Sequence, residues 1–261
     1  MDAGQPEMAI EAGRAKAVAV GMPASSARRL LILSSLPASQ NTEGQWLLPA
    51  KFVTGLKAYA QRWPGQVVVG LQRSAKTGAD LDNRFWSPAE LPFEVQIVRF
   101  SEVASVGSPL LDGAVVLVML NHQLHGLGQR CKEQGAIFVA NTELTLATQL
   151  QIARSGLGWG PRLIKTWFWL ARNHRRALQE IRDAKGLQCN GTPTFDAFAR
   201  HNPSPLLYFD NRTTSDLCAT ASDLEARFDS LTQRRRLRLL FSGRLHPIKG
   251  VHHLIPLACA L

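Results

Sequence analysis

Two basic residues near the end of the sequence have a spacing that suits phosphate binding. Arg244 directly follows Gly243, and Lys249 stands five positions later, immediately before Gly250. An apolar run precedes this segment and a helical pattern over residues 251–261 follows it. A strand, a turn and a helix start in this order bring backbone N–H groups and two cations to one point. Arginine can hold phosphate oxygens through its fork, and lysine supplies a mobile point charge. Taken alone, the pattern is compatible with a diphosphate site and equally with an ordinary turn between a strand and a helix.

The elements that precede this segment alternate between strand and helix patterns. Short apolar runs predict strands at residues 29–34, 66–71, 94–98, 115–120, 136–140, 186–189 and 206–209. Helical patterns occupy residues 45–62, 123–134, 143–155, 162–185 and 214–231. This alternation predicts an α/β fold, a Rossmann-like parallel sheet with helices on both faces.

The loops at the carboxyl ends of such strands are where ligands bind. Here they are residues 35–44, 121–125 and 141–143. We take His122 and Glu143 as the catalytic candidates, with Glu143 as a base or an acceptor contact. Each has an ordinary alternative. A carboxylate at the start of a helix is favoured by the helix dipole alone, and a loop histidine such as His122 or His125 is more often a surface or hydrogen-bonded residue.

Residues 239–250, Leu-Leu-Phe-Ser-Gly-Arg-Leu-His-Pro-Ile-Lys-Gly, resemble a known family motif. This is the Gly-Arg-Leu, three residues, Lys-Gly pattern of the retaining family-4 (group 1) glycosyltransferases, which have the two-domain GT-B fold. The resemblance implies a donor-diphosphate site at Gly243, Arg244, Lys249 and Gly250, where the two cations stabilise the departing nucleotide. That chemistry is electrostatic and requires no metal. No cofactor is implied beyond the nucleotide-diphosphate-sugar, which is the donor substrate.

Three further segments resemble one branch of these enzymes, so the likeness runs from about residue 110 to the end. They are residues 141–143, 186–193 and 207–212. We expect an acceptor-side loop set made of Gly44, Asn190, Gly191 and Thr192, with Thr192 capping a short helix. The family commonly has a glycine pair in its first loop, whereas only Gly44 stands near that place here.

The resemblance also predicts the domain organisation. We expect a flexible tail at residues 1–27, a Rossmann-like acceptor-side domain at 28–212, a helical linker at 213–236 and the truncated start of the donor-binding domain at 237–261. This last part would begin with a buried strand at residues 237–242. The paired glutamates that hold the donor sugar and ribose in this family are absent, which predicts an incomplete donor site.

The composition limits the class of protein. Hydrophobic residues make up 45% of the chain, enough for a sizeable core. The four cysteines are widely spaced, with no zinc-ligand pattern, and favour a reducing cytosol. The longest apolar run, residues 114–120, is far shorter than the roughly 20 residues of a membrane span. We therefore expect a cytoplasmic protein, and we expect any membrane association to be peripheral, at the inner face of the membrane.

The formal net charge of +10 favours anionic partners. Residues 162–185 combine Trp167, Phe168 and Trp169 with several arginines. The ordinary interpretation is a helix with its aromatic side chains in the core and its arginines in water. The alternatives are a helix that holds the protein to an anionic membrane surface and, least favoured, nucleic-acid binding, which no recognised motif accompanies.

The resemblance implies a glycosyltransferase that moves a sugar, with retention, from a nucleotide-diphosphate-sugar to a saccharide or lipid-linked saccharide acceptor. The alternative is a non-catalytic Rossmann-like binding remnant of such an enzyme. A dinucleotide-dependent enzyme is disfavoured because the loop after the first strand lacks the G-x-G-x-x-G pattern.

Overall fold

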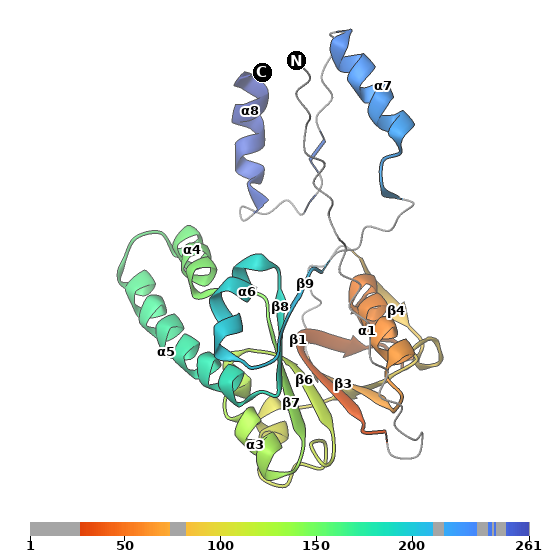
Figure 1. Ribbon diagram of the computed structural model, residues 1–261, viewed down its shortest axis with the longest axis vertical. Helices are drawn as coiled ribbons and strands as arrows, with labels where there is room; N and C mark the ends of the chain where they lie inside the picture. The colour runs from red at the N-terminus through yellow and green to blue at the C-terminus, as the bar shows by residue number, and fades with distance from the viewer. Residues whose placement is uncertain are drawn as a thin grey trace, which may run out of the picture.

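A central, mainly parallel sheet with helices around it forms the body of the protein (Figure 1). The computed structural model describes residues 27–73, 82–210, 217–233, 240–241, 243 and 249–260. The strands are β1 (Leu30–Gln40), β2 (Trp46–Pro49), β3 (Val67–Arg73), β4 (Asn83–Trp86), β5 (Glu94–Ile97), β6 (Val115–Met119), β7 (Ile137–Thr142), β8 (Gly186–Asn190) and β9 (Pro205–Tyr208).

Eight α-helices accompany the strands in the described part of the chain. They are α1 (Ala50–Arg62), α2 (Phe100–Val103), α3 (Leu127–Glu133), α4 (Leu146–Leu157), α5 (Pro161–Asp183), α6 (Thr192–Phe198), α7 (Ala221–Thr232) and α8 (Leu254–Ala260). Short 3₁₀ turns are η1 (Pro88–Glu90), η2 (His122–Leu124), η3 (Ala199–His201) and η6 (Val251–His253). Within the described residues, no helix combines the length and the apolar character that a membrane crossing requires.

The order of the parallel strands is that of a doubly wound sheet. The strands lie side by side as β5-β3-β1-β6-β7-β8-β9, and all of these neighbours pair in parallel. The chain winds outward from β1 through β3 to β5, then returns to β6 and winds the other way. The switch point therefore lies between β1 and β6, as in the Rossmann fold. The predicted fold class is confirmed.

Both faces of the sheet are buried, which explains why its strands are continuous apolar runs. Alternate residues of β1 enter different cores: Leu31 and Leu33 pack on the side of α3, and Leu30 and Ile32 pack on the side of α1. The five residues from Leu30 to Ser34 are all buried. Successive side chains of a strand point to opposite faces of the sheet, and here both faces are covered by apolar layers. The sequence of β1 therefore shows no alternation of apolar and polar residues.

The predicted helix from residue 45 begins later than expected. Residues Trp46–Pro49 form β2, which pairs antiparallel with the end of β1 and with β4. Pro49 disfavours helical geometry at Leu48, so α1 starts only at Ala50. Asp82 stabilises this start, because its main-chain carbonyl and its carboxylate accept from the N–H groups of Ala50 and Lys51.

Helix α5 is tied to the start of α3 by a buried carboxylate. Glu180 is 5% exposed, and its two oxygens accept hydrogen bonds from the N–H groups of Gly126 (2.5 Å) and Gly128 (2.9 Å). Both donors belong to the first turn of α3, where N–H groups have no partner within the helix. Desolvation raises the pKa of Glu180, and these two hydrogen bonds oppose the rise. The interaction sets the position of the loop between β6 and α3.

The interpretation that the aromatic residues of α5 lie in the core is wrong for Phe168 and Trp169, whereas Trp167 is partly buried. Phe168 is 75% exposed and Trp169 is 49% exposed. The buried side of the helix is formed instead by Leu163, Leu170 and Ile181. Because the helix turns about 100° per residue, Phe168 points away from that buried side, and Trp169 lies at its border. The predicted helix itself is confirmed, and it extends over Pro161–Asp183.

The C-terminal helices lie apart from the sheet (Figure 1). Neither α7 nor α8 buries a residue. The buried strand predicted at residues 237–242 is wrong where the structure describes it, because residues 240 and 241 are not in a strand and Leu240 is 92% exposed. An isolated strand has no partner for its backbone groups. The remaining positions of that segment, and Arg234–Arg236, lie outside the described residues, and the domain limits stay predictions.

We expect Glu180→Ala to lower the free energy of unfolding by about 3 kcal/mol, since it leaves the buried N–H group of Gly128 and the partly buried N–H group of Gly126 without their acceptor. Chemical denaturation followed by circular dichroism measures the change. Glu102→Ala, which breaks an exposed ion pair with Arg99, is the control and should leave stability nearly unchanged. Equal losses of unfolding free energy in the two variants would contradict a stabilising role for the hydrogen bonds between Glu180 and the start of α3.

Candidate functional site

A pocket of about 270 Å³ opens at the carboxyl ends of β6 and β7, against α5. We call it the histidine pocket. Its lining consists of Met119, Leu120, Asn121, His122, His125, Thr142, Glu143, Leu144, Gln149, Trp169, Asn173, His174, Ala177, Ile181 and Phe198. The structure therefore brings together the two residues predicted from sequence as catalytic candidates, His122 and Glu143. The histidine pocket lies at the edge of the sheet where ligands of doubly wound proteins bind.

His122 lies in the loop after β6, where local hydrogen bonds and an aromatic contact hold it in place. The Asn121 side chain accepts from the N–H group of Gln123 at 2.9 Å and caps the turn η2. The His122 ring meets the Trp169 ring edge-on, with 5.2 Å between centroids. Trp169 comes from α5, so the pocket depends on a helix that follows the loop by some forty residues.

Two polar side chains deeper in the pocket have unused hydrogen-bonding capacity. Both ring nitrogens of His125 and Nδ2 of Asn173 are buried, and none forms a hydrogen bond of regular geometry among the described residues, although the two side chains are adjacent. Burial lowers the pKa of His125, which outweighs the opposite effect of the adjacent Asn173 side chain; Arg176 and His122 lower it further. Burial also lowers the pKa of His174. The lowered pKa values favour the neutral form of the His125 and His174 imidazoles, and neutral rings that can donate and accept suit a ligand with hydroxyl groups.

Glu143 does not occupy the helix start predicted for it. The cap of α4 is Thr145, whose hydroxyl accepts from the N–H group of Thr148, and the helix begins at Leu146. Helix-dipole stabilisation thus does not explain a carboxylate at position 143. Although solvent reaches this side chain, desolvation raises the pKa of Glu143, the nearby Asp210 carboxylate raises it further, and Lys51 opposes both.

Lys51 and Asp210 form an ion pair beside Glu143 and connect α1 to the end of β9. Next to them, Tyr208 and Asn141 exchange hydrogen bonds of 3.0 and 3.1 Å. These residues surround Glu143 with one cation, one anion and two neutral groups. A carboxyl group with a raised pKa in such surroundings can accept a proton from a hydroxyl group near neutral pH.

The expected acceptor-side loop residues Asn190, Gly191 and Thr192 hold β8, β9 and α6 together. Gly191 has φ +85° and donates its N–H group to the carbonyl of Tyr208 at 2.8 Å. The Asn190 side chain accepts from the N–H group of Asp210 at 3.2 Å. The cap of α6 is Gly191 rather than the predicted Thr192, so the helix begins at Thr192, one position earlier than predicted. None of the three lines the histidine pocket.

Gly44 lies in the tight turn between β1 and β2 rather than in an open loop. Its φ of +78° favours glycine, its N–H group donates to the carbonyl of Asn41, and its carbonyl accepts from Gln40 at 2.7 Å. This residue also stands outside the lining of the histidine pocket.

The predicted diphosphate residues are only partly described. Arg244 lies outside the described residues. Gly250 has φ +73° and precedes the turn η6, so a side chain there would be strained. Lys249 and Gly243 are exposed.

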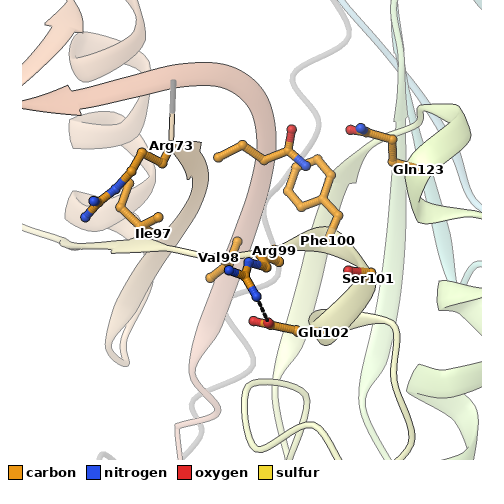
Figure 2. Close-up of a pocket in the computed structure, with 9 residues that line it drawn as sticks. Arg73, Ile97, Val98, Arg99, Phe100, Ser101, Glu102 and Gln123 are labelled. Carbon is orange, nitrogen blue, oxygen red and sulfur yellow. Dashed lines mark hydrogen bonds and ion pairs between the residues drawn. The ribbon is translucent and has the colours of Figure 1, made fainter. Parts of the chain in front are cut away.

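A second, larger hollow of about 810 Å³ lies at the carboxyl ends of β3 and β5 (Figure 2). We call it the basic groove; Gln72, Arg73, Ile97, Val98, Arg99, Phe100, Ser101, Glu102 and Gln123 line it. Figure 2 shows Arg99 paired with Glu102, at 3.0 Å. The sequence interpretation missed this groove, although Arg73 and Arg99 both follow predicted strands. Arg99 is already paired with Glu102, and the groove is wide open to solvent. It is therefore a weaker candidate for a ligand site than the histidine pocket.

Comparison with known proteins gives a distant structural likeness only. No protein-family model and no curated protein matches the chain. Among solved structures, the chain is similar to Phytolacca americana UGT2 complexed with UDP-2fluoro-glucose and pterostilbene, at 12% identity and TM-score 0.36, covering 76% of this chain and 56% of that one. The apo form of UGT2 gives the same identity and score, with 54% of its length covered. The chain thus spans about half the length of these proteins, and so low a similarity assigns neither family nor activity.

Among the described residues, no group of three or more His, Cys, Asp and Glu side chains could hold a metal ion.

The buried histidine predicts how stability depends on pH. Because the pKa of His125 is lower in the folded protein than the ordinary 6.5, the unfolded chain binds a proton first as pH falls, and stability is lost below about pH 6.5. We expect His125→Phe, which cannot ionise, to weaken this dependence in denaturation curves recorded from about pH 8 to pH 5. The exposed His252 gives the control His252→Phe, which should leave the dependence unchanged. An unaltered pH dependence in His125→Phe would contradict a neutral His125.

Proposed function

We propose that this protein is a glycosyltransferase of the GT-B type that moves a sugar from a nucleotide-diphosphate-sugar to a saccharide or lipid-linked saccharide acceptor, with retention at the anomeric carbon. The observation that carries the proposal is the order of its parts. A Gly-Arg-Leu…Lys-Gly segment follows a doubly wound sheet, and a pocket at the ligand edge of that sheet holds His122 and Glu143.

The proposed division of labour follows from the chemistry of each site. Arg244 and Lys249 hold the donor diphosphate and stabilise the negative charge that develops on the leaving nucleotide. The histidine pocket takes the acceptor: His122 and His125 bond its hydroxyl groups, and Trp169 offers a ring face against which a sugar can pack. Holding both substrates together supplies the remainder of the rate enhancement through proximity.

Glu143 is proposed to contact the reacting hydroxyl group of the acceptor and to receive its proton. Its raised pKa supports this role, because a base is most effective when its pKa approaches the working pH. The hydrogen-bonded pair Tyr208 and Asn141 and the ion pair Lys51–Asp210 act as positioning groups around it.

The alternative is a binding remnant that keeps the fold and the histidine pocket without turnover. The exposed Leu240 and the absence of buried residues in α8 favour it for the described part of the chain. The two proposals differ in one respect: a remnant binds a saccharide in the pocket but does not bind a nucleoside diphosphate.

Nucleoside diphosphate binding separates these proposals. We expect the full chain to bind UDP, GDP or ADP in isothermal titration calorimetry. Arg244→Ala and Lys249→Ala should each weaken that binding about tenfold to a hundredfold, since each removes a charge-assisted phosphate contact of roughly 1.5–3 kcal/mol.

The matched control is Arg227→Ala, which removes an exposed cation of α7 that has no proposed role. Binding that is lost equally in the control, or that is absent for all three nucleotides, would contradict the donor site and leave the binding remnant as the better description.

A further inference from the structure

The segment between Glu143 and Glu180 has an unusual charge composition. Residues 144–179 contain six basic side chains and no acidic one. The six are Arg154, Arg162, Lys165, Arg172, Arg175 and Arg176. This segment forms the helical hairpin of α4 and α5, which projects at one side of the sheet domain (Figure 1). It therefore concentrates much of the net charge of +10 on one part of the surface.

Large apolar side chains are exposed among these cations. Trp159 and Phe168 are each 75% exposed and Ile164 is 55% exposed. Ile164 and Phe168 stand one turn apart on the same face of α5. Trp159, in the turn of the hairpin, lies against the Trp167 ring, with 6.3 Å between centroids, and under the Arg154 guanidinium at 4.7 Å. We call Trp159, Ile164 and Phe168, with the six basic residues, the hairpin surface.

The packing of α5 explains why this surface faces outward. Leu163, Leu170 and Ile181 form its buried side, and the Glu180 carboxylate fixes the helix against α3. The outer face is thus held rigidly, and its apolar side chains cannot turn inward without breaking these contacts. Rigid presentation of aromatic and basic groups lowers the conformational entropy lost on binding.

We propose that the hairpin surface docks the protein on an anionic lipid bilayer. In that mode Trp159, Ile164 and Phe168 enter the boundary between headgroups and acyl chains, where aromatic side chains are favoured. The surrounding arginines and Lys165 bind lipid phosphates, and the attraction grows with each basic residue near the surface. The finding that no described helix can cross a membrane is compatible with attachment in the plane of the interface.

Charge and side-chain type favour a bilayer over other partners. A second copy of this chain would bring the same six cations against each other, which opposes association. A nucleic acid would satisfy the cations and could stack on Trp159, but it offers nothing to the aliphatic Ile164. An anionic bilayer satisfies both kinds of group at once. The proposal stands on these side chains alone and does not depend on sugar transfer.

Vesicle flotation of the full chain tests the proposal. We expect binding to vesicles of phosphatidylcholine with phosphatidylglycerol, little binding to phosphatidylcholine alone, and a decrease with added salt. The double variants Trp159→Ser/Phe168→Ser and Arg172→Gln/Arg175→Gln should each reduce the partition coefficient at least tenfold. All four side chains are exposed, so unchanged circular dichroism spectra and melting temperatures should accompany the loss.

Matched variants elsewhere on the surface provide the controls. Arg62→Gln/Arg227→Gln removes two exposed cations, and Phe85→Ser removes an aromatic side chain that is 51% exposed; both should retain vesicle binding. The proposal is overturned if anionic vesicles do not bind the chain, if the controls lose binding as the hairpin variants do, or if the chain binds single-stranded RNA through these residues and ignores vesicles. A negative result for vesicle binding would say nothing about nucleoside diphosphate binding, so the two proposals fail separately.

Discussion

The buried Glu180 carboxylate and the two N–H groups that it accepts from determine much of this architecture. A carboxylate taken out of water is stable only when its oxygens are hydrogen-bonded, and the start of α3 supplies both donors. Glycine is favoured at both positions: Gly126 has φ +90°, and a Cβ on Gly128 would make tight contacts of 3.1 Å with Glu180 and Phe138. The contact fixes α5 against α3 and places the loop that carries His122 and His125.

One helix therefore serves two surfaces. The inner side of α5 packs on the core through Leu170 and Ile181 and lines the histidine pocket with Asn173 and His174. Its outer side presents Phe168 among basic residues. Trp169 belongs to both, because it is half exposed and also meets the His122 ring. A ligand in the pocket and a lipid surface on the hairpin would lie on neighbouring parts of the same rigid element, which suits a lipid-linked acceptor.

The fold could be predicted from sequence because the information is local. Runs such as Leu30–Leu33 are apolar throughout, as strands buried on both faces must be, and their alternation with helices indicated a parallel sheet. Contacts between distant segments could not be predicted. The strand at Trp46–Pro49 exists through its pairing with β1 and β4. The partners of Glu180 lie more than fifty positions away, and Asn173 reaches His125 only because α5 folds back over the loop. Charge pattern alone also could not tell which side of α5 faces the core.

The central claim is sugar transfer with the donor held by Arg244 and Lys249 and the acceptor held in the histidine pocket. The most direct measurement is release of nucleoside diphosphate from a panel of UDP-, GDP- and ADP-sugars by the protein expressed from its own reading frame, with membrane lipid extract as the acceptor source. The account predicts release from one donor class, with loss of at least a hundredfold in Lys249→Ala and Glu143→Gln. Release that is absent for every donor, or unchanged in both variants, would contradict it.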